Sequence, residues 1–318
     1  MKVLRIIIAL ILTLAMLYVA RNNSRGRPEY FSHSENGYSF EYNTVPKGQE
    51  FSEATIPLTI KGRFDGNIHP VMRRSLPGNP DIANLAAYES SPLQPCDSAA
   101  DCFQTTVTAG KKNGRFYYYF EITDTTGASL ATFMQPDGSP FMFRYIGAVP
   151  PAITVTHIVL IFATVFFIAL GTIHAVGLIG GNTNVKPLAM YSFLAAVCAF
   201  LGGYPFGIPM NYYAFDGFWE GVPFGTDATD NKTQLLFVYL LFMTLATWGS
   251  LRGKPRRDIF SRRVLGWYGV GSFAVMLFIY LIPHSIQFSP TLTYTFCYSW
   301  IGVVALIYFI GRVRTSRA

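Results

Sequence analysis

The sequence predicts an α+β membrane protein with an N-terminal signal anchor, an extracytoplasmic antiparallel β-sandwich and a five-helix transmembrane bundle. Three observations predict this class. Hydrophobic residues make up 51% of the 318 residues and charged residues only 14%, whereas soluble domains carry about 25% charged residues. The apolar residues gather in runs long enough to cross a bilayer. A polar segment, 28–150, separates the first apolar run from the others.

Residues 1–27 are expected to form a signal anchor, or a signal peptide, with a short linker. An apolar stretch at 6–20 follows a basic head and precedes a polar run. Its length also suits a cleaved signal peptide, but cleavage after Ala20 would place bulky Tyr18 where a small residue is preferred. We therefore favour an uncleaved anchor and leave cleavage as the alternative.

Residues 28–150 are expected to form the β-sandwich, with an immunoglobulin-like arrangement. Short β-favouring runs alternate with turn sequences such as Pro136-Asp137-Gly138, and strands at this spacing are typical of a sandwich. The stretch 73–102 lacks this alternation and is predicted to be a loop. The predicted strands are 55–61, 103–108, 116–123, 129–134 and 141–146.

The four cysteines divide by location. Cys96 and Cys102 lie in the polar segment, whereas Cys198 and Cys297 lie in apolar runs. Disulfides persist in oxidising compartments, so an extracytoplasmic placement predicts a bridge between Cys96 and Cys102, with free thiols as the alternative. The other two cysteines are expected to pack in the core.

Residues 151–318 are expected to form the transmembrane domain, with a long outer loop at 207–234. Six lysines and arginines lie between 252 and 263, and more arginines follow the last apolar run. Cytoplasmic loops of membrane proteins are enriched in lysine and arginine. This loop and the C-terminus are therefore expected in the cytoplasm, and 28–150 outside it. The predicted spans are 153–179, 188–206, 235–251, 264–282 and 292–310.

The same charge distribution bears on partners. The net charge is +7, but the basic residues lie in loops and do not form the clustered face of a nucleic-acid-binding protein. We expect no nucleic acid. The expected partners are the lipid bilayer of a cytoplasmic-type membrane and protein partners in a membrane complex.

Two histidines are candidate cofactor ligands. His157 begins the first span of the bundle, and His284 ends the fourth, so the topology places both near the outer face. Imidazoles from facing helices could hold haem b or, with carboxylates, a divalent metal. Polar packing between helices is the alternative interpretation of both residues.

The outer loop 207–234 supplies the candidate carboxylate ligands Glu220, Asp227 and Asp230. Long ordered loops in compact folds are often functional, and carboxylates are ligands for hard cations. An alternative role is structural. Thr229, Asp230 or Asn231 would be a good N-cap for the following helix, and the aromatic residues of the loop would form an interfacial belt.

Function follows only in outline from these features. The chain has no nucleophile motif, phosphate loop, zinc spacing or dinucleotide fingerprint, so an enzyme is not indicated. We expect a non-enzymatic integral membrane subunit or accessory protein with an extracytoplasmic docking domain. The first alternative is a haem- or metal-binding membrane redox protein with a site at the outer face. A transporter is the second, although its expected intramembrane charges and repeats are missing from the sequence.

Overall fold

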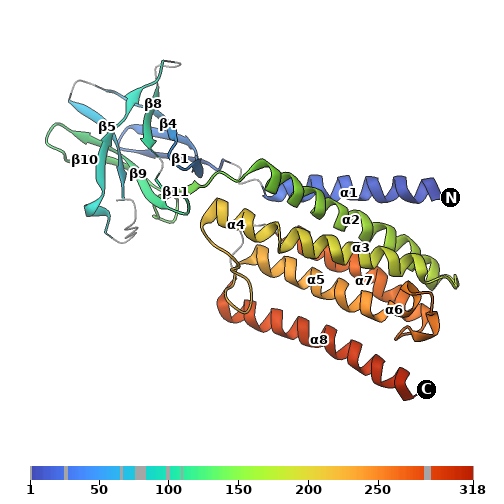
Figure 1. Cartoon of the computed structure of the whole chain (residues 1–318). Coiled ribbons are helices and arrows are strands. Elements are labelled where there is room, and N and C mark those ends of the chain that lie inside the picture. The colour runs from blue at the N-terminus through green and yellow to red at the C-terminus, as the bar shows by residue number, and fades with distance from the viewer. Residues whose placement is uncertain are drawn as a thin grey trace. The chain divides into compact units, whose positions relative to one another are not determined.

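The computed structural model describes residues 2–24, 28–64, 67–75, 84–97, 101–108, 110–282 and 288–317. The chain forms an N-terminal helix, two β-sheets and a helical region (Figure 1). Contacts divide it into two compact units. The β unit comprises Gly26–Ala148 with Tyr213–Asp216, and the helical unit comprises Met1–Arg25, Val149–Tyr212 and Gly217–Ala318.

Two sheets form the β unit. The first has the strand order β1-β2-β4-β8-β7, and the second has the order β3-β11-β9-β5-β6, with β10 also paired to β9. All pairs are antiparallel except β3 with β11. The strands of the first sheet are β1 (Tyr30–Glu35), β2 (Tyr38–Asn43), β4 (Glu53–Lys61), β7 (Gln94–Pro95) and β8 (Cys102–Thr108). Those of the second are β3 (Lys47–Gln49), β5 (Ile68–Arg74), β6 (Glu89–Pro92), β9 (Arg115–Asp124), β10 (Ser129–Phe133) and β11 (Phe141–Ile146).

A single aromatic-rich core holds the β unit together, with buried side chains from both sheets. Within this core, the hydroxyl groups of Tyr42 and Tyr118 are 2.5 Å apart, and the Val45 N–H donates to Tyr42 Oη at 3.0 Å. A buried hydroxyl without a partner costs free energy, so this pairing lets two tyrosines occupy the core. The largest fully buried residues here include Phe40, Ile56, Leu58, Phe116, Phe120 and Phe143.

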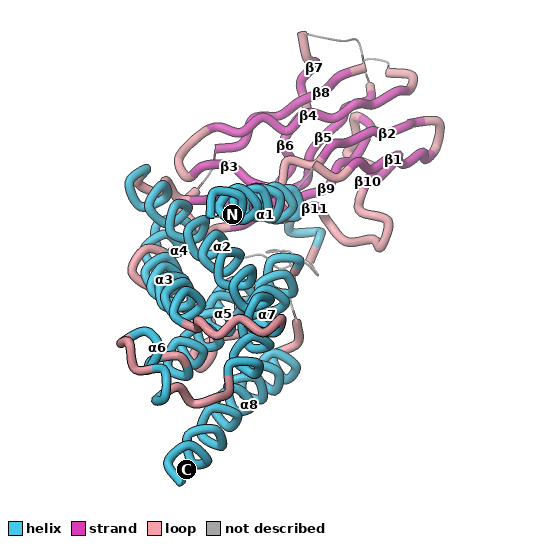
Figure 2. The backbone as a smooth tube through the Cα atoms, turned by 90° about the vertical axis from the view of Figure 1, so that its right-hand side faces the viewer, coloured by secondary structure: helices cyan, strands magenta, loops and turns pink. Residues whose placement is uncertain are grey.

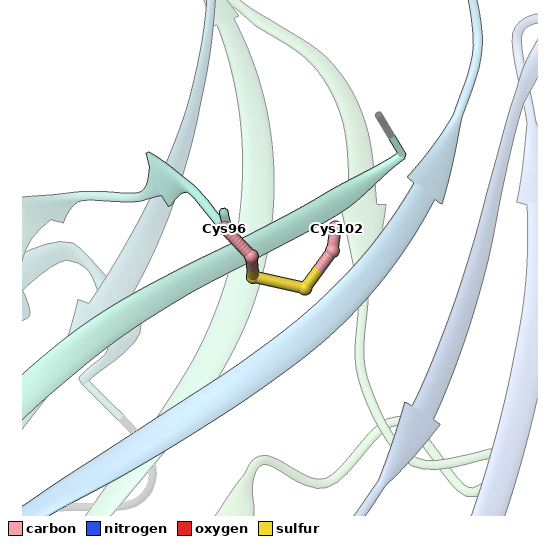
Figure 3. Close-up of a disulfide and its surroundings, with 2 residues drawn as sticks. All are labelled: Cys96 and Cys102. Atoms are coloured by element: carbon pink, nitrogen blue, oxygen red, sulfur yellow. A yellow bond between two sulfur atoms is a disulfide. The ribbon is translucent and has the colours of Figure 1, made fainter. Parts of the chain in front are cut away.

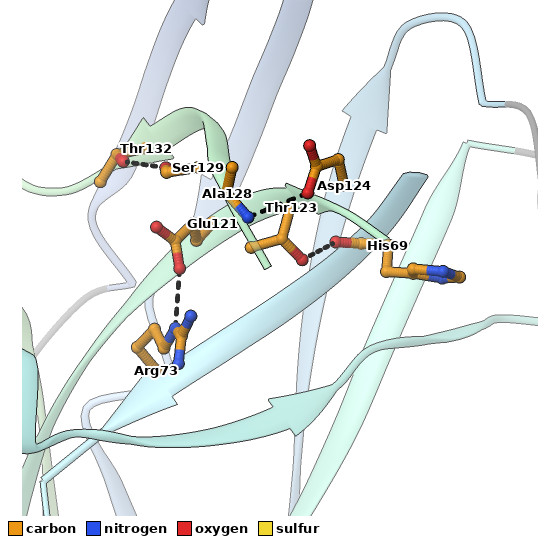
Figure 4. Close-up of polar contacts among 8 residues, drawn as sticks. All are labelled: His69, Arg73, Glu121, Thr123, Asp124, Ala128, Ser129 and Thr132. Carbon is orange, nitrogen blue, oxygen red and sulfur yellow. Dashed lines mark hydrogen bonds and ion pairs between the residues drawn. The ribbon is translucent and has the colours of Figure 1, made fainter. Parts of the chain in front are cut away.

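Polar contacts connect the central strand β9 to its neighbours (Figure 4). Arg73 Nε on β5 donates to Glu121 Oε2 on β9 at 2.7 Å, and Thr123 Oγ1 donates to the His69 carbonyl at 3.2 Å. Asp124 Oδ1 accepts from the Ala128 N–H at 2.9 Å in the turn towards β10. The first two bonds satisfy Glu121 and Thr123, which are buried, whereas the bond to Asp124 lies in an exposed turn.

The predicted disulfide between Cys96 and Cys102 is present (Figure 3). It connects the residue after β7 to the first residue of β8, and the Cys96 N–H also donates to the Cys102 carbonyl at 2.8 Å. The bridge therefore fastens a two-residue edge strand to its neighbour.

The prediction of a loop over 73–102 was wrong in part. This stretch contains the end of β5, a 3-10 helix at Leu85–Ala87, β6 and β7. Both β6 and β7 end on prolines and lie at sheet edges. Edge strands tolerate proline because one side of the strand needs no backbone donor, so the prolines did not prevent strand formation.

The helical unit contains α1 and a set of helices that follow the β unit (Figure 2). Helix α5 contacts α3, α7 and α8, and α2 contacts α3 and α7. The α-helices of the chain are α1 (Lys2–Ser24), α2 (Pro151–Ile179), α3 (Lys186–Gly203), α4 (Gly207–Phe215), α5 (Ala228–Ala246), α6 (Trp248–Leu251), α7 (Arg262–Leu281) and α8 (Pro290–Arg317).

Among the described residues, five helical segments are long and apolar enough to cross a membrane: Lys2–Asn22, Pro151–Ile179, Lys186–Phe215, Arg262–Leu281 and Pro290–Arg314. They indicate association with a lipid bilayer. The predicted span 235–251 is not among them. Helix α5 begins with several polar residues, and the chain leaves it after Ala246, before the short helix α6. Its apolar part starts at Leu235 and the helix ends at Ala246, so the predicted span 235–251 does not correspond to one helix.

Candidate functional site

The acids of the 207–234 loop lie where the chain enters α5. Asp227 is the N-cap of this helix, and its Oδ1 accepts from the Thr229 N–H at 2.8 Å and from the Asp230 N–H at 3.0 Å. The expected cap at Thr229, Asp230 or Asn231 is therefore corrected to Asp227. The helix begins earlier than expected because it extends through a polar first turn before the apolar run.

Asp230 ties the loop back onto the helix. Its Oδ2 accepts from the Glu220 N–H at 2.7 Å. Burial raises the pKa of Asp230 to about 6, and the negative charges of Asp227 and Glu220 add to this effect, whereas the hydrogen bond from Glu220 opposes it. Asp230 precedes the apolar part of α5. The three predicted metal ligands thus lie in one electrostatic neighbourhood. All three take part in hydrogen bonds that shape the loop, Glu220 through its N–H and the two aspartates through their carboxylates.

Asn231 fixes the same loop from inside the helical unit. Its Oδ1 accepts from the Val222 N–H at 2.8 Å, and the residue is only 4% exposed. Its Nδ2 has no hydrogen-bond partner in the described part of the chain. A buried amide donor is normally satisfied, so this group indicates a place where a further acceptor would fit.

The aromatic residues of the loop differ in exposure. Trp219 is half-buried and stacks on Tyr204 with ring centroids 4.9 Å apart, whereas Phe218 is 67% exposed and Tyr212 is 39% exposed. Phe218 and Tyr212 are available for the interfacial role that we predicted. Trp219 instead helps to pack the loop.

His157 lies on α2 and lines a small cavity inside the helical unit. Its Nδ1 is 2.9 Å from the Gly202 carbonyl on α3. A carbonyl only accepts, so Nδ1 carries the hydrogen and Nε2 is the free acceptor in the neutral ring. The cavity has a volume of about 100 Å³, and its polar lining residues are His157, Thr164, Thr229, Lys232, Thr233 and Tyr280.

The structure thus places the predicted ligands in two groups. Glu220, Asp227 and Asp230 shape the loop, whereas His157 faces a cavity lined by hydroxyl groups and an amine. His284 lies outside the described residues. Within the described ranges, no group of three or more His, Cys, Asp or Glu side chains is placed to hold a metal ion. The haem and metal sites stay predictions.

Sequence reasoning missed the role of Lys232 as a buried cation. It is 6% exposed, and its Nζ donates to the Ile282 carbonyl at the end of α7 at 2.8 Å. Burial lowers the pKa of Lys232 to about 8, against the opposing effect of Asp227. The signal in the sequence was a single lysine between a capping sequence and an apolar run.

The fold and this site define an α+β protein whose long apolar helices suit a lipid bilayer. Neither the models of known protein families nor the curated proteins contain a match to the chain.

Proposed function

We propose that the chain is a non-enzymatic integral membrane subunit or accessory protein. In this proposal the β unit is an extracytoplasmic docking domain, and the helical unit anchors it in a cytoplasmic-type membrane. The observation that carries the proposal is a difference in exposed apolar surface: the helical unit exposes many apolar side chains, and the β unit exposes few.

The β unit keeps its large apolar side chains in one core, and among its described residues it exposes Tyr30, Phe51 and Met142. The helical unit instead exposes aliphatic and aromatic residues along whole helices, including Leu14 at 58% and Phe309 at 59%. Soluble proteins rarely expose such extended apolar surface. The contrast supports a water-facing domain on a lipid-facing anchor.

Strand order supports the immunoglobulin-like part of the proposal. One sheet contains β4-β8-β7, and the other contains β11-β9-β5 with β6 at its edge. These correspond in chain order to strands B, E and D of one immunoglobulin sheet and to G, F and C of the other. The β1-β2 hairpin then extends the first sheet, and β10 is an addition between F and G. Many cell-surface domains use this architecture, so the link to docking is an analogy of fold.

Basic residues support the proposed orientation. Arg252, Lys254, Arg256 and Arg257 are all exposed in the connection between α6 and α7. Lysine and arginine are retained on the cytoplasmic side of membrane proteins, so this connection faces the cytoplasm in the proposal. The connections on the opposite side, together with the β unit, would then face outward.

Cross-linking in intact cells tests the docking role. An amine-reactive, membrane-impermeant cross-linker should join the β unit to a stoichiometric partner through exposed lysines such as Lys47, Lys61 and Lys111. The complex should persist through purification in a mild detergent. A protein that purifies alone, with no cross-links from these lysines, contradicts the docking role.

A haem- or metal-binding redox protein is the second candidate, because His157 has its Nδ1 engaged by a carbonyl and its Nε2 available. Histidine ligands are commonly oriented by such a bond from the other ring nitrogen. A visible spectrum and elemental analysis of the purified protein test this candidate. A Soret band or a stoichiometric metal that is lost in His157→Ala would favour it over the docking proposal.

A further inference from the structure

A second cavity of about 180 Å³ lies between α5, α7 and α8 in the helical unit. Its wall is almost entirely apolar, with Leu235 from α5, Phe278 and Ile279 from α7, and Leu292, Phe296 and Cys297 from α8. An apolar cavity of about 150 Å³ in another protein is large enough for benzene. This cavity therefore has room for a short run of hydrocarbon.

Three polar residues line this mostly apolar cavity: Asn231 and Lys232 of α5, and Thr293 of α8, whose hydroxyl donates to the Ser289 carbonyl at 3.1 Å. Asn231 and Lys232 line the cavity next to Ala228, and both are more than nine-tenths buried. Asn231 cannot turn its amide without losing the bond that its Oδ1 accepts from Val222. Its Nδ2, which has no partner in the described part of the chain, is therefore fixed as a donor on a residue that lines the cavity.

Lys232 gives this end of the cavity a positive charge. Its Nζ is anchored on the Ile282 carbonyl at 2.8 Å, which holds the ammonium in place. The described lining contains no Asp or Glu. A ligand that fits must combine hydrocarbon with a hydrogen-bond acceptor at one end, and negative charge on that acceptor would complement Lys232.

We propose that this cavity binds a fatty acid, with the carboxylate accepting a hydrogen bond from Asn231 Nδ2 beside the Lys232 ammonium and the first chain carbons packed between α5, α7 and α8. A neutral hydrocarbon would leave the Asn231 donor unsatisfied. A fatty alcohol could accept that bond but would not complement the charge of Lys232. This inference is independent of the docking function, since every residue in it belongs to the helical unit.

Cys297 provides a readout inside the cavity, and Cys198 provides an internal control. Both thiols are free, but only Cys297 lines the cavity. In the full-length protein in detergent, saturating decanoate should slow the alkylation of Cys297 by N-ethylmaleimide at least tenfold and leave the rate at Cys198 unchanged. Decanol at the same concentration should protect much less. Equal protection by the two compounds, or none by decanoate, would overturn the proposal.

Two variants separate recognition of the head from filling of the cavity. Asn231→Asp keeps an oxygen for the Val222 N–H but replaces the donor with a negative charge, so its Kd for radiolabelled decanoate should rise at least tenfold. Cys297→Met should weaken binding by occupying cavity volume and leave the polar end intact. Equilibrium dialysis measures both, and a far-ultraviolet spectrum checks that each variant is folded. Unchanged affinity in the folded Asn231→Asp variant would refute the assignment of the head group.

Discussion

The half-buried carboxylate of Asp230 accepts a hydrogen bond from the Glu220 N–H and lies near the negative charges of Asp227 and Glu220. Its pKa of about 6 lies above the ordinary value of 3.8. Between these two values the folded state binds more protons than the unfolded state, so the contribution of this group to stability is present at low pH and is lost as pH rises through about 6.

Asp230→Asn tests this pH dependence. The amide keeps an oxygen that can accept from the Glu220 N–H but cannot ionise. The variant should therefore gain stability relative to the original protein when both are moved from pH 5 to pH 7.5. Thermal unfolding of the detergent-solubilised proteins at the two pH values measures the difference. Identical pH profiles would show that the carboxyl group titrates normally.

Asp227 is predicted to stabilise α5 through its two capping hydrogen bonds. Asp227→Ala should lower the free energy of unfolding by about 1 kcal/mol, which is typical for the loss of an N-cap. Asp227→Asn is the matched control, because asparagine caps helices about as well as aspartate. Denaturant unfolding compares the three proteins. Loss of stability in both variants would assign the effect to charge and not to capping.

At the residue scale, the sequence predicted a feature that depends on nearby residues, but it did not predict which charged side chain is buried. The Cys96–Cys102 bridge followed from compartment and spacing alone. The burial of Lys232 could not be predicted in this way. Lys232 donates to the carbonyl of Ile282, the C-cap of α7, and this helix is distant in the sequence. Sequence spacing carries no information about such a partner.

At the scale of elements, the main runs were recognised and the sheet edges were not. The β1-β2 hairpin turns at Asn36-Gly37, where φ is 48° and 85°. This dipeptide is a strong hairpin signal in the sequence. The strands β6 and β7 are short and contain proline, so their pairing depends on neighbouring strands and not on local preference.

The tight return between α6 and α7 provides a test of local structure. A Cβ added at Gly249 would lie 2.5 Å from the Lys254 carbonyl oxygen and 2.7 Å from the Asp258 nitrogen. The Asp258 carboxylate also accepts from the Ser250 N–H at 2.7 Å, so this connection is tightly packed. Gly249→Ala should therefore open it and speed trypsin cleavage at the arginines nearby.

Gly253→Asn is the control for this substitution. Gly253 has a φ of +74° with nothing within 4 Å of an added Cβ, and asparagine tolerates this backbone region. Its trypsin cleavage should match that of the original protein. Equal cleavage of the Gly249→Ala and Gly253→Asn variants would contradict the close packing at Gly249.

At the scale of the whole molecule, composition and run length were sufficient to predict an α+β chain with helices suited to a membrane. They did not separate α5 from the candidate spans. The polar residues in its first turns hold the loop and line the two cavities. Only the part of the helix from Leu235 onward has the apolar composition of a membrane span. The candidate site was predicted less completely than the fold. The acids could be identified from the sequence, but their hydrogen bonds depend on the geometry of the loop.

The central claim is an anchored protein with the β unit outside the cytoplasm, and cysteine labelling in intact cells tests it most directly. Cysteines would be placed at exposed Asp137, Phe218 and Arg256, since Asp258 is buried. The free thiols Cys198 and Cys297 would first be replaced by serine. An impermeant maleimide should label positions 137 and 218 in intact cells and reach 256 only after permeabilisation. Labelling of 256 but not of 137 in intact cells would contradict the account.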